Sequence, residues 1–406
     1  MREGWTYKKL GEITKVINGL WIGKKPPLKT VAVIRNTNFT KDCKLSTTNI
    51  AYIDVEEKQF EKKRLLQGDI IIEKSGGSEK QPVGRPILFN LIGGEFSFSN
   101  FTSVIRIDNP NEIISPFLHL ALYGAYLRGE TLKMQAKTTG IHNLDFKAYN
   151  RILIPIPSLQ EQQQIVSELD LLSSVIEKQK AQIEELDKLA QSIFYDMFGD
   201  PVENEKGWEV KKLVQVSSKI TNGNTPKGGS DVYIDEGILF FRSQNVWRNR
   251  IDLDDIAYID EETHKKLHNS SLMHNDILIT KTGRFNTENS SLGRASLYEG
   301  TDNEANINGH VYLVRLKSGM IHKFVLYILI SNSFRDLIRR VCVGGIDKRQ
   351  LNKNHIEDFP IIIPPLSLQQ EFADKIEAIE SMKAKVRQSL KESETLFNSR
   401  MDFYFS

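Results

Sequence analysis

Two stretches of the chain, 158–199 and 366–406, place apolar residues at alternating steps of four and three. This spacing is typical of helices whose a and d positions form a coiled-coil seam. Nine of the ten seam positions are apolar in the first stretch and seven of ten in the second. The predicted seam residues are Ile165, Leu169, Leu172, Ile176, Gln179, Ile183, Leu186, Ala190, Ile193 and Met197, then Phe372, Ile376, Ile379, Lys383, Val386, Leu390, Ser393, Phe397, Arg400 and Tyr404.

The ends of both helices are marked by local signals. Ser158-Leu159-Gln160-Glu161 is a capping box after a proline, Ser367-Leu368-Gln369-Gln370 is its counterpart, and Gly199-Asp200-Pro201 ends the first helix. Each seam is the simplest partner for the other, which predicts an antiparallel coiled coil about 60 Å long. Dimerisation through the first seam alone is the alternative.

The segments before the helices, 1–157 and 200–365, alternate short β-type runs with turn residues and short helical patterns. We therefore predict two mixed α/β domains and an α+β fold class for the whole chain. The predicted strands are Val31–Arg35, Ile70–Glu73, Val104–Ile107, Ile238–Arg242, Ile277–Thr280 and Val311–Arg315; the predicted short helices include Pro116–Leu127 and His322–Ile338.

The chain also repeats itself. Gly68-Asp69-Ile70-Ile71-Ile72 returns as Asn275-Asp276-Ile277-Leu278-Ile279 at an offset of 207 residues. Segments near the start return at an offset of 203, and Ile105-Arg106-Ile107 returns as Val314-Arg315-Leu316 at 209. A repeat in register over nearly the whole chain predicts two copies of one structural unit, related by pseudo-two-fold symmetry.

Composition narrows the possible functions. The 406 residues are 40% hydrophobic and 26% charged, and no apolar run approaches the roughly 18 residues that a membrane span needs. Cys43 and Cys342 are too few for a disulfide framework or a zinc site, so we expect a cytoplasmic protein. The net charge is only +2, but residues 1–150 carry 22 Lys and Arg against 15 Asp and Glu, whereas residues 158–200 carry 3 against 9. A basic globular part beside an acidic helix suits one surface for phosphate and another for protein, although ordinary solvated faces would also explain it.

Signatures of catalysis are weak. The chain has no phosphate-cradling Gly-x-x-x-x-Gly-Lys loop, and the Glu73-Lys74 pair after Asp69 becomes Thr280-Lys281 in the second copy, so the carboxylate is not kept. His264, His268 and His274 lie near one another in sequence without a cysteine or a suitably spaced acid. We therefore expect neither a catalytic set nor a metal site in this chain.

Taken in order, these features resemble one family. Each globular half opens on Trp-x3-Lys-Leu, continues through Gly-Asp-Ile-Ile-Ile or Asn-Asp-Ile-Leu-Ile, and ends on Ile-Pro with Ser-Leu-Gln and a heptad helix. The chain thus resembles the specificity (S) subunit of type I restriction–modification enzymes over essentially its full length. The resemblance implies target recognition domains at 1–157 and 200–365, a central coiled-coil helix at 158–199 and a distal one at 366–406.

The resemblance also implies a non-catalytic, DNA-reading role. Each recognition domain would bind one half of a bipartite, asymmetric site on double-stranded DNA, and the antiparallel helices would fix the gap. Two methyltransferase (M) subunits would dock on this scaffold, and restriction/translocase (R) subunits would join them. The chain itself would bind no cofactor; the complex would use S-adenosylmethionine for adenine N6 methylation, and ATP and Mg²⁺ for cleavage.

Candidate DNA contacts combine cations for phosphates with side chains that pair with base edges, such as Arg with guanine and Asn or Gln with adenine. Gly76 and Gly283 would let the backbone approach the duplex. The candidates in the first domain are Lys24, Lys25, Arg35, Asn36, Lys74, Ser75, Lys80, Arg85, Lys137, Thr138, His142 and Asn143. Those in the second are Arg242, Gln244, Asn245, Lys281, Thr282, Arg284, Asn286, His310, Lys348 and Arg349, with Asn308 and Gln350 beside them.

Two other functions stay open at this point. One is a specificity subunit that serves a fused methyltransferase–nuclease polypeptide, as in type IIB or IIG-like systems, which the neighbouring gene would reveal. The other is a coiled-coil scaffold with no role on DNA, which would show no affinity for duplex DNA even with its partners present.

Overall fold

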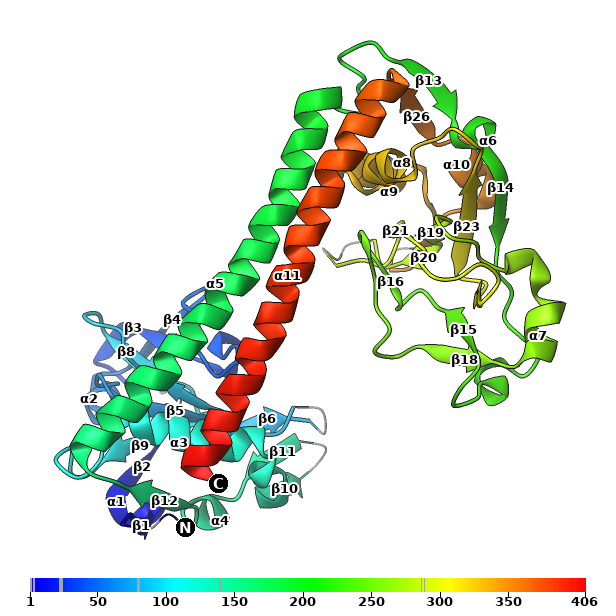
Figure 1. The fold of residues 1–406 in the computed structure, drawn as a ribbon. Helices are drawn as coiled ribbons and strands as arrows, with labels where there is room; N and C mark the ends of the chain where they lie inside the picture. The colour runs from blue at the N-terminus through cyan, green and yellow to red at the C-terminus, as the bar shows by residue number, and fades with distance from the viewer. Residues whose placement is uncertain are drawn as a thin grey trace. The chain divides into compact units, whose positions relative to one another are not determined.

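The computed structural model describes the chain except for residues 1, 3, 22–24, 79–80, 139–140, 286, 288 and 346, and except for the side chains of residues 137 and 138. It divides into two compact units (Figure 1). Unit 1 comprises residues 1–180 and 388–406, and unit 2 comprises residues 181–387.

The globular part of unit 1 is built on three small sheets. Its described strands are ordered β2-β9-β5-β7, β4-β3-β8 and β10-β11-β6, and β1 pairs with β12. The elements are β1 Thr6–Lys9, α1 Leu10–Ile13, β2 Thr14–Asn18, β3 Leu28–Ile34, β4 Ala51–Glu56, α2 Glu57–Lys63, β5 Ile70–Glu73, β6 Ser75–Gly77, β7 Pro86–Leu88, β8 Phe96–Phe98, β9 Thr102–Ile107, α3 Ser115–Leu127, β10 Gln135–Thr138, β11 Ile141–Leu144, α4 Phe146–Tyr149 and β12 Leu153–Ile156.

Unit 2 repeats this topology. Its described strands are ordered β14-β23-β19-β21, β18-β15-β22 and β20-β25-β24, and β13 pairs with β26. The elements are β13 Glu209–Lys212, α6 Leu213–Val216, β14 Ser217–Asn222, β15 Ile238–Phe241, β16 Val246–Trp247, β17 Arg250–Ile251, β18 Ala257–Ile259, α7 Glu261–Lys266, β19 Ile277–Thr280, β20 Thr282–Gly283, β21 Ala295–Leu297, β22 Ala305–Ile307, β23 Val311–Leu316, α8 His322–Ile330, α9 Asn332–Val341, β24 Val343–Gly344, β25 Arg349–Gln350, α10 Lys353–Glu357 and β26 Pro360–Ile363.

The predicted α+β fold class is therefore confirmed, and the sequence repeat is a repeat of sheet order. One predicted helix, His322–Ile338, is wrong: the segment forms two helices, α8 and α9, separated at Ser331. The Ser331 hydroxyl accepts a hydrogen bond from the backbone N–H of Phe334 (3.3 Å), so this serine caps the N-terminus of α9 and separates it from α8.

Inside each unit the four-stranded sheet is fixed by the same buried ion pair. Asp69, at the start of β5, accepts two hydrogen bonds of 2.7 Å from Arg106 on β9. Asp276 accepts two from Arg315 on β23, at 2.8 and 2.7 Å. Both aspartates are buried, and each also accepts a backbone N–H from the loop before its strand. These bonds satisfy each buried carboxylate, as a charge removed from water requires.

The two long helices are α5, Leu159–Phe198, and α11, Leu366–Phe405, each 40 residues long. In unit 1 the first half of α5 packs against the last half of α11, and in unit 2 the pairing is reversed, so the helices are antiparallel (Figure 1). All twenty predicted seam positions are buried or half-buried. The Ser158 hydroxyl accepts from the Glu161 N–H (3.2 Å), as a capping box requires, whereas α11 starts at Leu366, one residue before Ser367.

Three polar seam residues, Gln179, Lys383 and Arg400, bond to the opposite helix. In unit 2 the Lys383 ammonium is buried and lies 2.5 Å from Asp187 of α5 and 2.9 Å from Glu380 of its own helix. In unit 1 Arg400 pairs with Glu168, and the Gln179 amide donates to the Ser389 hydroxyl (2.9 Å). The hydrogen bond from Arg400 lowers the pKa of Glu168, which favours the ionised form of that carboxyl. These cross-helix bonds fix the register, because a shift of one turn would leave each group without its partner.

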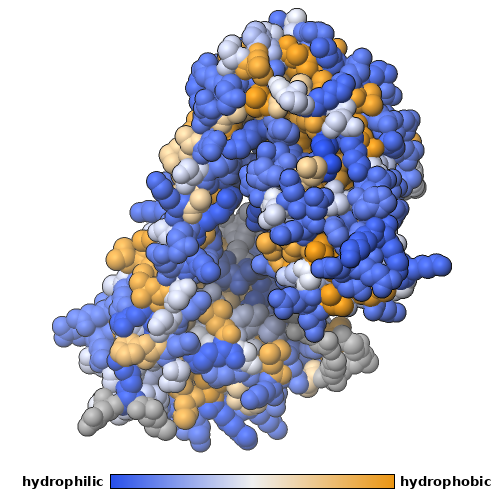
Figure 2. Space-filling model, turned by 45° about the vertical axis from the view of Figure 1, so that its right-hand side comes forward, coloured by the Kyte–Doolittle hydropathy of each residue, from blue (hydrophilic) through white to orange (hydrophobic). Residues whose placement is uncertain are grey.

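The helix ends also complete the core of each unit. In unit 2 the rings of Phe194, Phe198 and Phe372 meet Phe324 of α8, with centroids 4.7 Å apart for Phe198 and Phe324. In unit 1 Phe405 of α11 lies 5.3 Å from Phe117 of α3, measured between ring centroids. The remaining surface is mostly hydrophilic, with hydrophobic side chains in scattered patches on the face in Figure 2.

Leu169 tests the contribution of the seam to stability. It is fully buried in the unit 1 core, whereas Leu171, two residues along the same helix, is 66% exposed. We expect Leu169→Ala to lower the free energy of unfolding by about 2–5 kcal/mol, because it leaves a cavity, and Leu171→Ala to change it by less than about 0.5 kcal/mol. Urea unfolding followed by tryptophan fluorescence measures both, and equal effects would place Leu169 outside the core.

Candidate nucleic-acid interface

The predicted contact loops of the two units have the same backbone framework. The N–H of Lys74 donates to Phe101, and that of Lys281 donates to His310, at 2.9 and 2.8 Å. Their carbonyls accept from Leu144 (2.8 Å) and Leu351 (2.9 Å), two leucines at the 207-residue offset. The small sheets β6-β11-β10 and β20-β25-β24 therefore place side chains at equivalent positions in the two units.

In unit 1 this framework forms a shallow open pocket that we call the unit 1 face. The Ser75 hydroxyl and the Asn143 side-chain oxygen lie 2.5 Å apart within it, and two large aromatic side chains, Trp21 and Phe101, are 66% and 46% exposed. The residues that line it are Trp21, Lys74, Ser75, Asn100, Phe101, Ile141 and Asn143. A cation beside amide and hydroxyl groups with exposed aromatic rings is the chemistry of nucleic-acid contact.

Lys74 is the cation that lines the unit 1 face, and its charge acts on nearby Lys63. Burial lowers the pKa of Lys74, and burial with the nearby charge of Lys74 lowers the pKa of Lys63. Both shifts mean that the charged forms are less well solvated than in water, which an approaching anion would offset. Lys63 also donates to the carbonyl of Gly19 (2.7 Å).

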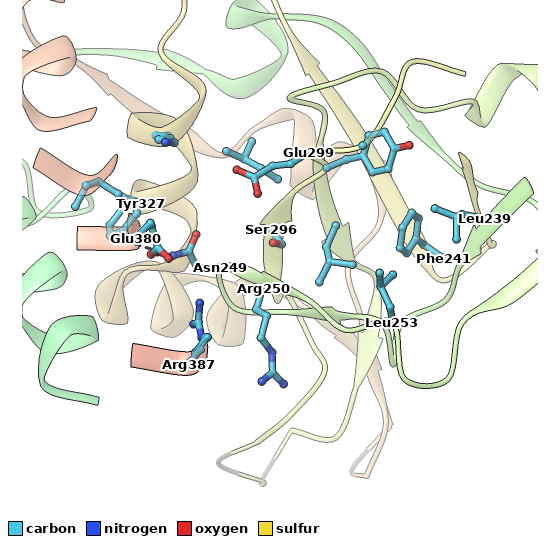
Figure 3. A pocket seen from close by; sticks show the side chains of 16 residues that line it. Leu239, Phe241, Asn249, Arg250, Leu253, Ser296, Glu299, Tyr327, Glu380 and Arg387 are labelled. Atoms are coloured by element: carbon cyan, nitrogen blue, oxygen red, sulfur yellow. Dashed lines mark hydrogen bonds between the residues drawn. The ribbon is translucent and has the colours of Figure 1, made fainter. Parts of the chain in front are cut away.

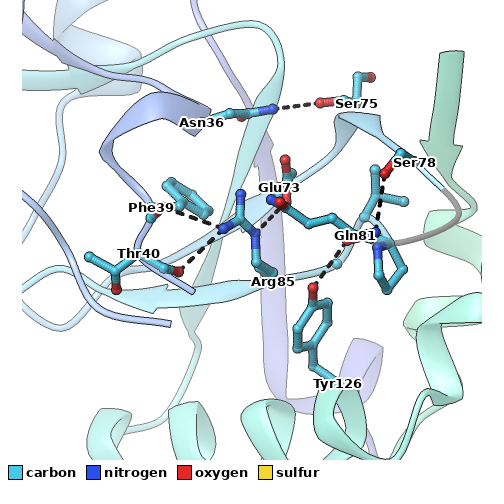
Figure 4. A network of polar contacts seen from close by, with 12 residues as sticks. Asn36, Phe39, Thr40, Glu73, Ser75, Ser78, Gln81, Arg85 and Tyr126 are labelled. Atoms are coloured by element: carbon cyan, nitrogen blue, oxygen red, sulfur yellow. Dashed lines mark hydrogen bonds and ion pairs between the residues drawn. The ribbon is translucent and has the colours of Figure 1, made fainter. Parts of the chain in front are cut away.

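Arg35 and Asn36 lie at the end of β3 beside the unit 1 face. Arg35 is exposed and makes a 3.4 Å bond to the carbonyl of Asn49, while the Asn36 amide donates to the carbonyl of Ser75 (2.6 Å; Figure 4). Gly76 has a φ of +104°, where a side chain would be strained, and a Cβ there would lie 3.2 Å from the Asn36 amide. Lys25 is exposed, and its N–H donates to Glu56 (3.3 Å).

The structure does not support a direct DNA contact for Arg85. Its side chain is almost fully buried, pairs with Glu73 at 2.7 Å, and donates to the carbonyls of Phe39 and Thr40 (Figure 4). His142 is also buried, with Nδ1 3.1 Å from the Gln135 side-chain oxygen. We therefore correct both residues from contact to framework positions, because their polar groups are used inside the domain.

Five other candidate contacts lie wholly or partly outside the residues that the structure describes. Lys24 and Lys80 lie outside the described residues, as does Asn286 of unit 2. Lys137 and Thr138 lie on β10, whose backbone pairs with His142 and Ile141 of β11, but their side chains are outside the description.

In unit 2 most candidates gather on the equivalent framework, which we call the unit 2 face. The Arg349 guanidinium lies 4.3 Å from the ring centroid of Phe285, and the Thr282 hydroxyl lies 3.4 Å from Nδ1 of His310. Lys281 is half-buried, 5.9 Å from the Tyr312 ring centroid. The exposed members are Arg284, His310, Lys348 and Gln350.

The side chains around Arg242 mostly form hydrogen bonds and ion pairs within one turn. Asn245 is buried, accepts the N–H of Arg242 (2.9 Å) and donates to the carbonyls of Asp252 and Asp255, so it is a framework residue and not a contact. Arg242 itself pairs with Asp255 (3.2 Å), and the exposed Gln244 amide donates to the same carboxylate (3.0 Å). These two bonds lower the pKa of Asp255.

Gly283 and Asn308 are also framework residues. A Cβ on Gly283 would lie 2.2 Å from the backbone nitrogen of Leu292, and the Asn308 side-chain oxygen accepts a hydrogen bond from the His310 N–H (3.0 Å).

A separate cleft in unit 2 is lined by residues within 239–300 of the globular part and by residues of α8 and α11 (Figure 3). Its polar groups bond to one another: the Asn249 amide donates to Glu380 (2.9 Å) and lies 3.4 Å from the Tyr327 hydroxyl. Among the residues that the structure describes, no group of three or more His, Cys, Asp or Glu is placed to hold a metal ion. Within the same residues, no helix is long and apolar enough to span a membrane.

Four residues of the unit 1 face were not predicted as contacts: Trp21, Asn100, Phe101 and Ile141. The repeat could have identified Phe101, because subtracting 209 from His310, which was predicted, gives this position. Trp21 and Asn100 carry no comparable signal in the sequence.

Comparison with known proteins identifies a family for both halves of the chain. Residues 2–188 and 205–392 each match the family described as type I restriction modification DNA specificity domain. The specificity subunit of the StySPI type I restriction enzyme from Salmonella potsdam is 24% identical, over 98% of this chain and 86% of that protein. The EcoKI specificity subunit from Escherichia coli K12 is 23% identical, over 93% and 82%.

Solved structures agree in fold. The type I restriction–modification S subunit from M. genitalium superposes with a TM-score of 0.53 at 13% identity, over 100% of this chain and 98% of that one. A chain from a structure on complex assembly and conformational transition of the type I system gives 0.55 at 17% identity, over 100% and 98%.

Arg85 and Arg35 make a matched pair for a stability test. Arg85→Ala leaves Glu73 buried without its partner, so we expect a loss of about 3–5 kcal/mol in the free energy of unfolding of unit 1. Arg35→Ala removes an exposed side chain and should cost less than about 0.5 kcal/mol. Chemical unfolding of both variants measures the difference. An Arg85→Ala variant as stable as the wild type would contradict the assignment of Arg85 as a framework residue.

Proposed function

The chain belongs to the type I restriction–modification DNA specificity family and is the non-catalytic subunit that recognises DNA in such a complex, and we propose that each unit reads one half of a bipartite, asymmetric site. The observation that carries this proposal is the repeated framework with unlike side chains. Lys74 and Lys281 keep one backbone environment, while Phe101 is replaced by His310 and Asn143 by Gln350. One frame with two sets of side chains favours a target with two unrelated halves.

The division of contacts follows from their chemistry. The cations Lys74, Lys281 and Lys348 suit phosphates and set the position of each unit, whereas Asn143 and Gln350 suit the paired edge of adenine. The exposed Arg35 and Arg284 suit guanine or phosphate. The framework residues Arg85, His142 and Asn245 hold these loops and do not take part.

We propose that α5 and α11 set the gap between the half-sites and dock two methyltransferase subunits. The seam supports this role, because its cross-helix bonds fix one register and one length. Half-sites about one helical turn apart lie ~34 Å from centre to centre, within the span of 40-residue helices. In the proposed complex, the methyltransferase subunits use S-adenosylmethionine for adenine N6 methylation, and the restriction subunits use ATP and Mg²⁺ for cleavage.

Mapping N6-methyladenine across the host genome tests the function directly. With the gene present, we expect one bipartite motif, and with the gene deleted, its loss. Asn143→Ala should then relax the sequence of one half only, and Gln350→Ala that of the other half only, each by about 1–3 kcal/mol of discrimination. A variant that relaxed both halves equally would contradict the assignment of one half-site to each unit.

The length of the helix pair provides a second test. Deleting residues 179–185 and 384–390 removes one heptad from each helix and keeps the seam in phase, with Ile176 then followed by Leu186 and Lys383 by Ser393. The shortening of ~10 Å should reduce the gap by about three base pairs and leave both half-sequences unchanged. The same methylation map reads the gap, and an unchanged spacing would reject the helices as its determinant.

A further inference from the structure

Unit 2 carries a cluster of arginines that the predicted contact residues do not include. They come from three parts of the unit: the β16–β17 hairpin, the residue before β21, and α9. The members of this arginine cluster are Arg248, Arg250, Arg294, Arg335 and Arg339.

Trp247 holds two of these guanidinium groups. The Arg294 guanidinium lies 3.8 Å from the ring centroid of Trp247 and that of Arg250 lies 5.5 Å from it. The indole N–H donates to the carbonyl of Gln244 (3.0 Å), which keeps the ring in place. Stacking on one aromatic ring therefore holds two like charges close together.

The cluster is electrostatically crowded. Burial lowers the pKa of Arg248, and the charges of Arg335, Arg294 and Arg339 lower it further. Burial and then the charge of Arg250 lower the pKa of Arg294. Described carboxylates lie near two members: Asp252 is 3.3 Å from Arg250 and Asp336 is 3.3 Å from Arg339.

The equivalent place in unit 1 is neutralised. Arg85 corresponds to Arg294 at the 209-residue offset and pairs with the buried Glu73, but Glu73 is replaced by Thr280 in unit 2. Arg294 instead donates to the carbonyls of Ser290 (3.0 Å) and Asn289 (2.5 Å). Unit 2 thus keeps the arginine and lacks the carboxylate, while α9 brings two further arginines.

One segment of the chain connects the unit 2 face with the arginine cluster. The segment from Gly283 to Arg294 starts at β20, passes Phe285 under Arg349, and ends at the arginine stacked on Trp247. Cations connected in this way to base-reading side chains suit an extended polyanion that contacts both.

We propose that the fully or partly exposed members of the arginine cluster, Arg248, Arg250 and Arg339, bind the phosphate backbone of duplex DNA next to the half-site read by unit 2, whereas the buried Arg294 holds Trp247 in place. This rests on the proposed function. The cluster supplies affinity for DNA that does not depend on base sequence. Unit 1 has no such contribution at the equivalent place, because Glu73 neutralises Arg85 there, whereas Thr280 replaces that carboxylate in unit 2. An acidic surface of a partner protein is the competing ligand, and the experiment separates the two.

The test uses the complex reconstituted from the full chain and its methyltransferase subunits, titrated on duplex DNA over a range of KCl concentrations. The variant combines Arg248→Gln, Arg250→Gln and Arg339→Gln, whose side chains are exposed or partly exposed. We expect the slope of log K against log[KCl] to become shallower by roughly 0.9 for each lost phosphate contact, thus by about two to three. Affinity should fall alike on duplexes with and without the target, and the methylated motif should stay the same.

The matched control removes the same charge elsewhere in unit 2, through Lys265→Gln, Lys266→Gln and Lys353→Gln. These lysines are exposed and pair with glutamates on their own helices. Their slope should equal that of the wild type. If the triple arginine variant fails to fold, Arg248→Gln alone should still change the slope by about one.

Four outcomes would overturn the proposal: an unchanged slope, an equal change in the control, a loss confined to one base sequence, or failure to assemble with the methyltransferase subunits while DNA affinity is kept. The last would assign the cluster to an acidic protein surface. Failure of the wild-type complex to bind any duplex would instead reject the proposed function itself.

Discussion

Burial of the apolar faces of α5 and α11 is the constraint on which both units depend. The ends of these helices are parts of the two hydrophobic cores, with Phe405 against Phe117 in unit 1 and Phe198 and Phe372 against Phe324 in unit 2. Neither globular part can therefore complete its core without helix segments from distant parts of the chain. We therefore expect the sheets to fold and the helices to pair in one cooperative transition within each unit.

The two units differ in which buried charged residues are paired. The Asp69–Arg106 and Asp276–Arg315 pairs are kept in both copies, because they tie equivalent strands together. The Glu73–Arg85 pair is not kept, since Thr280 replaces Glu73 in the second copy. A buried carboxylate neutralises the arginine in one unit, and its absence leaves an arginine stacked on Trp247 in the other. One change of residue type thus replaces a buried ion pair with a buried arginine that stacks on Trp247 and donates to backbone carbonyls.

The fold was largely predictable from the sequence, because it rests on periodicity and repetition. Heptad spacing gave both helices, and runs such as Ile70–Glu73 and Ile277–Thr280 coincide with strands β5 and β19. The break between α8 and α9 was missed, because one serine that caps a helix does not interrupt an apolar pattern.

The contact residues were harder to predict. Residue type does not distinguish an exposed Arg35 from a buried Arg85 twelve residues after Glu73, and only the fold brings Glu73 and Arg85 together. The side chain of Asn245 likewise suits a base edge in sequence but closes a turn in the structure. Trp21 and Asn100 reach the unit 1 face through tertiary packing alone.

The polar seam residues explain why the helices should pair with each other and not with copies of themselves. Lys383 is buried and needs Asp187, which only α5 provides; the repeat position on α5 is Ile176. Arg400 likewise needs Glu168 of α5. Two copies of α11 would bring lysine and arginine into a seam without these carboxylates, and two copies of α5 would lose the cations that pair with them. In a pair of α11 helices Lys383 would keep only Glu380 of its own helix, and because a buried charge that loses a partner is destabilised, the Lys383–Asp187 pair disfavours dimerisation through the second seam.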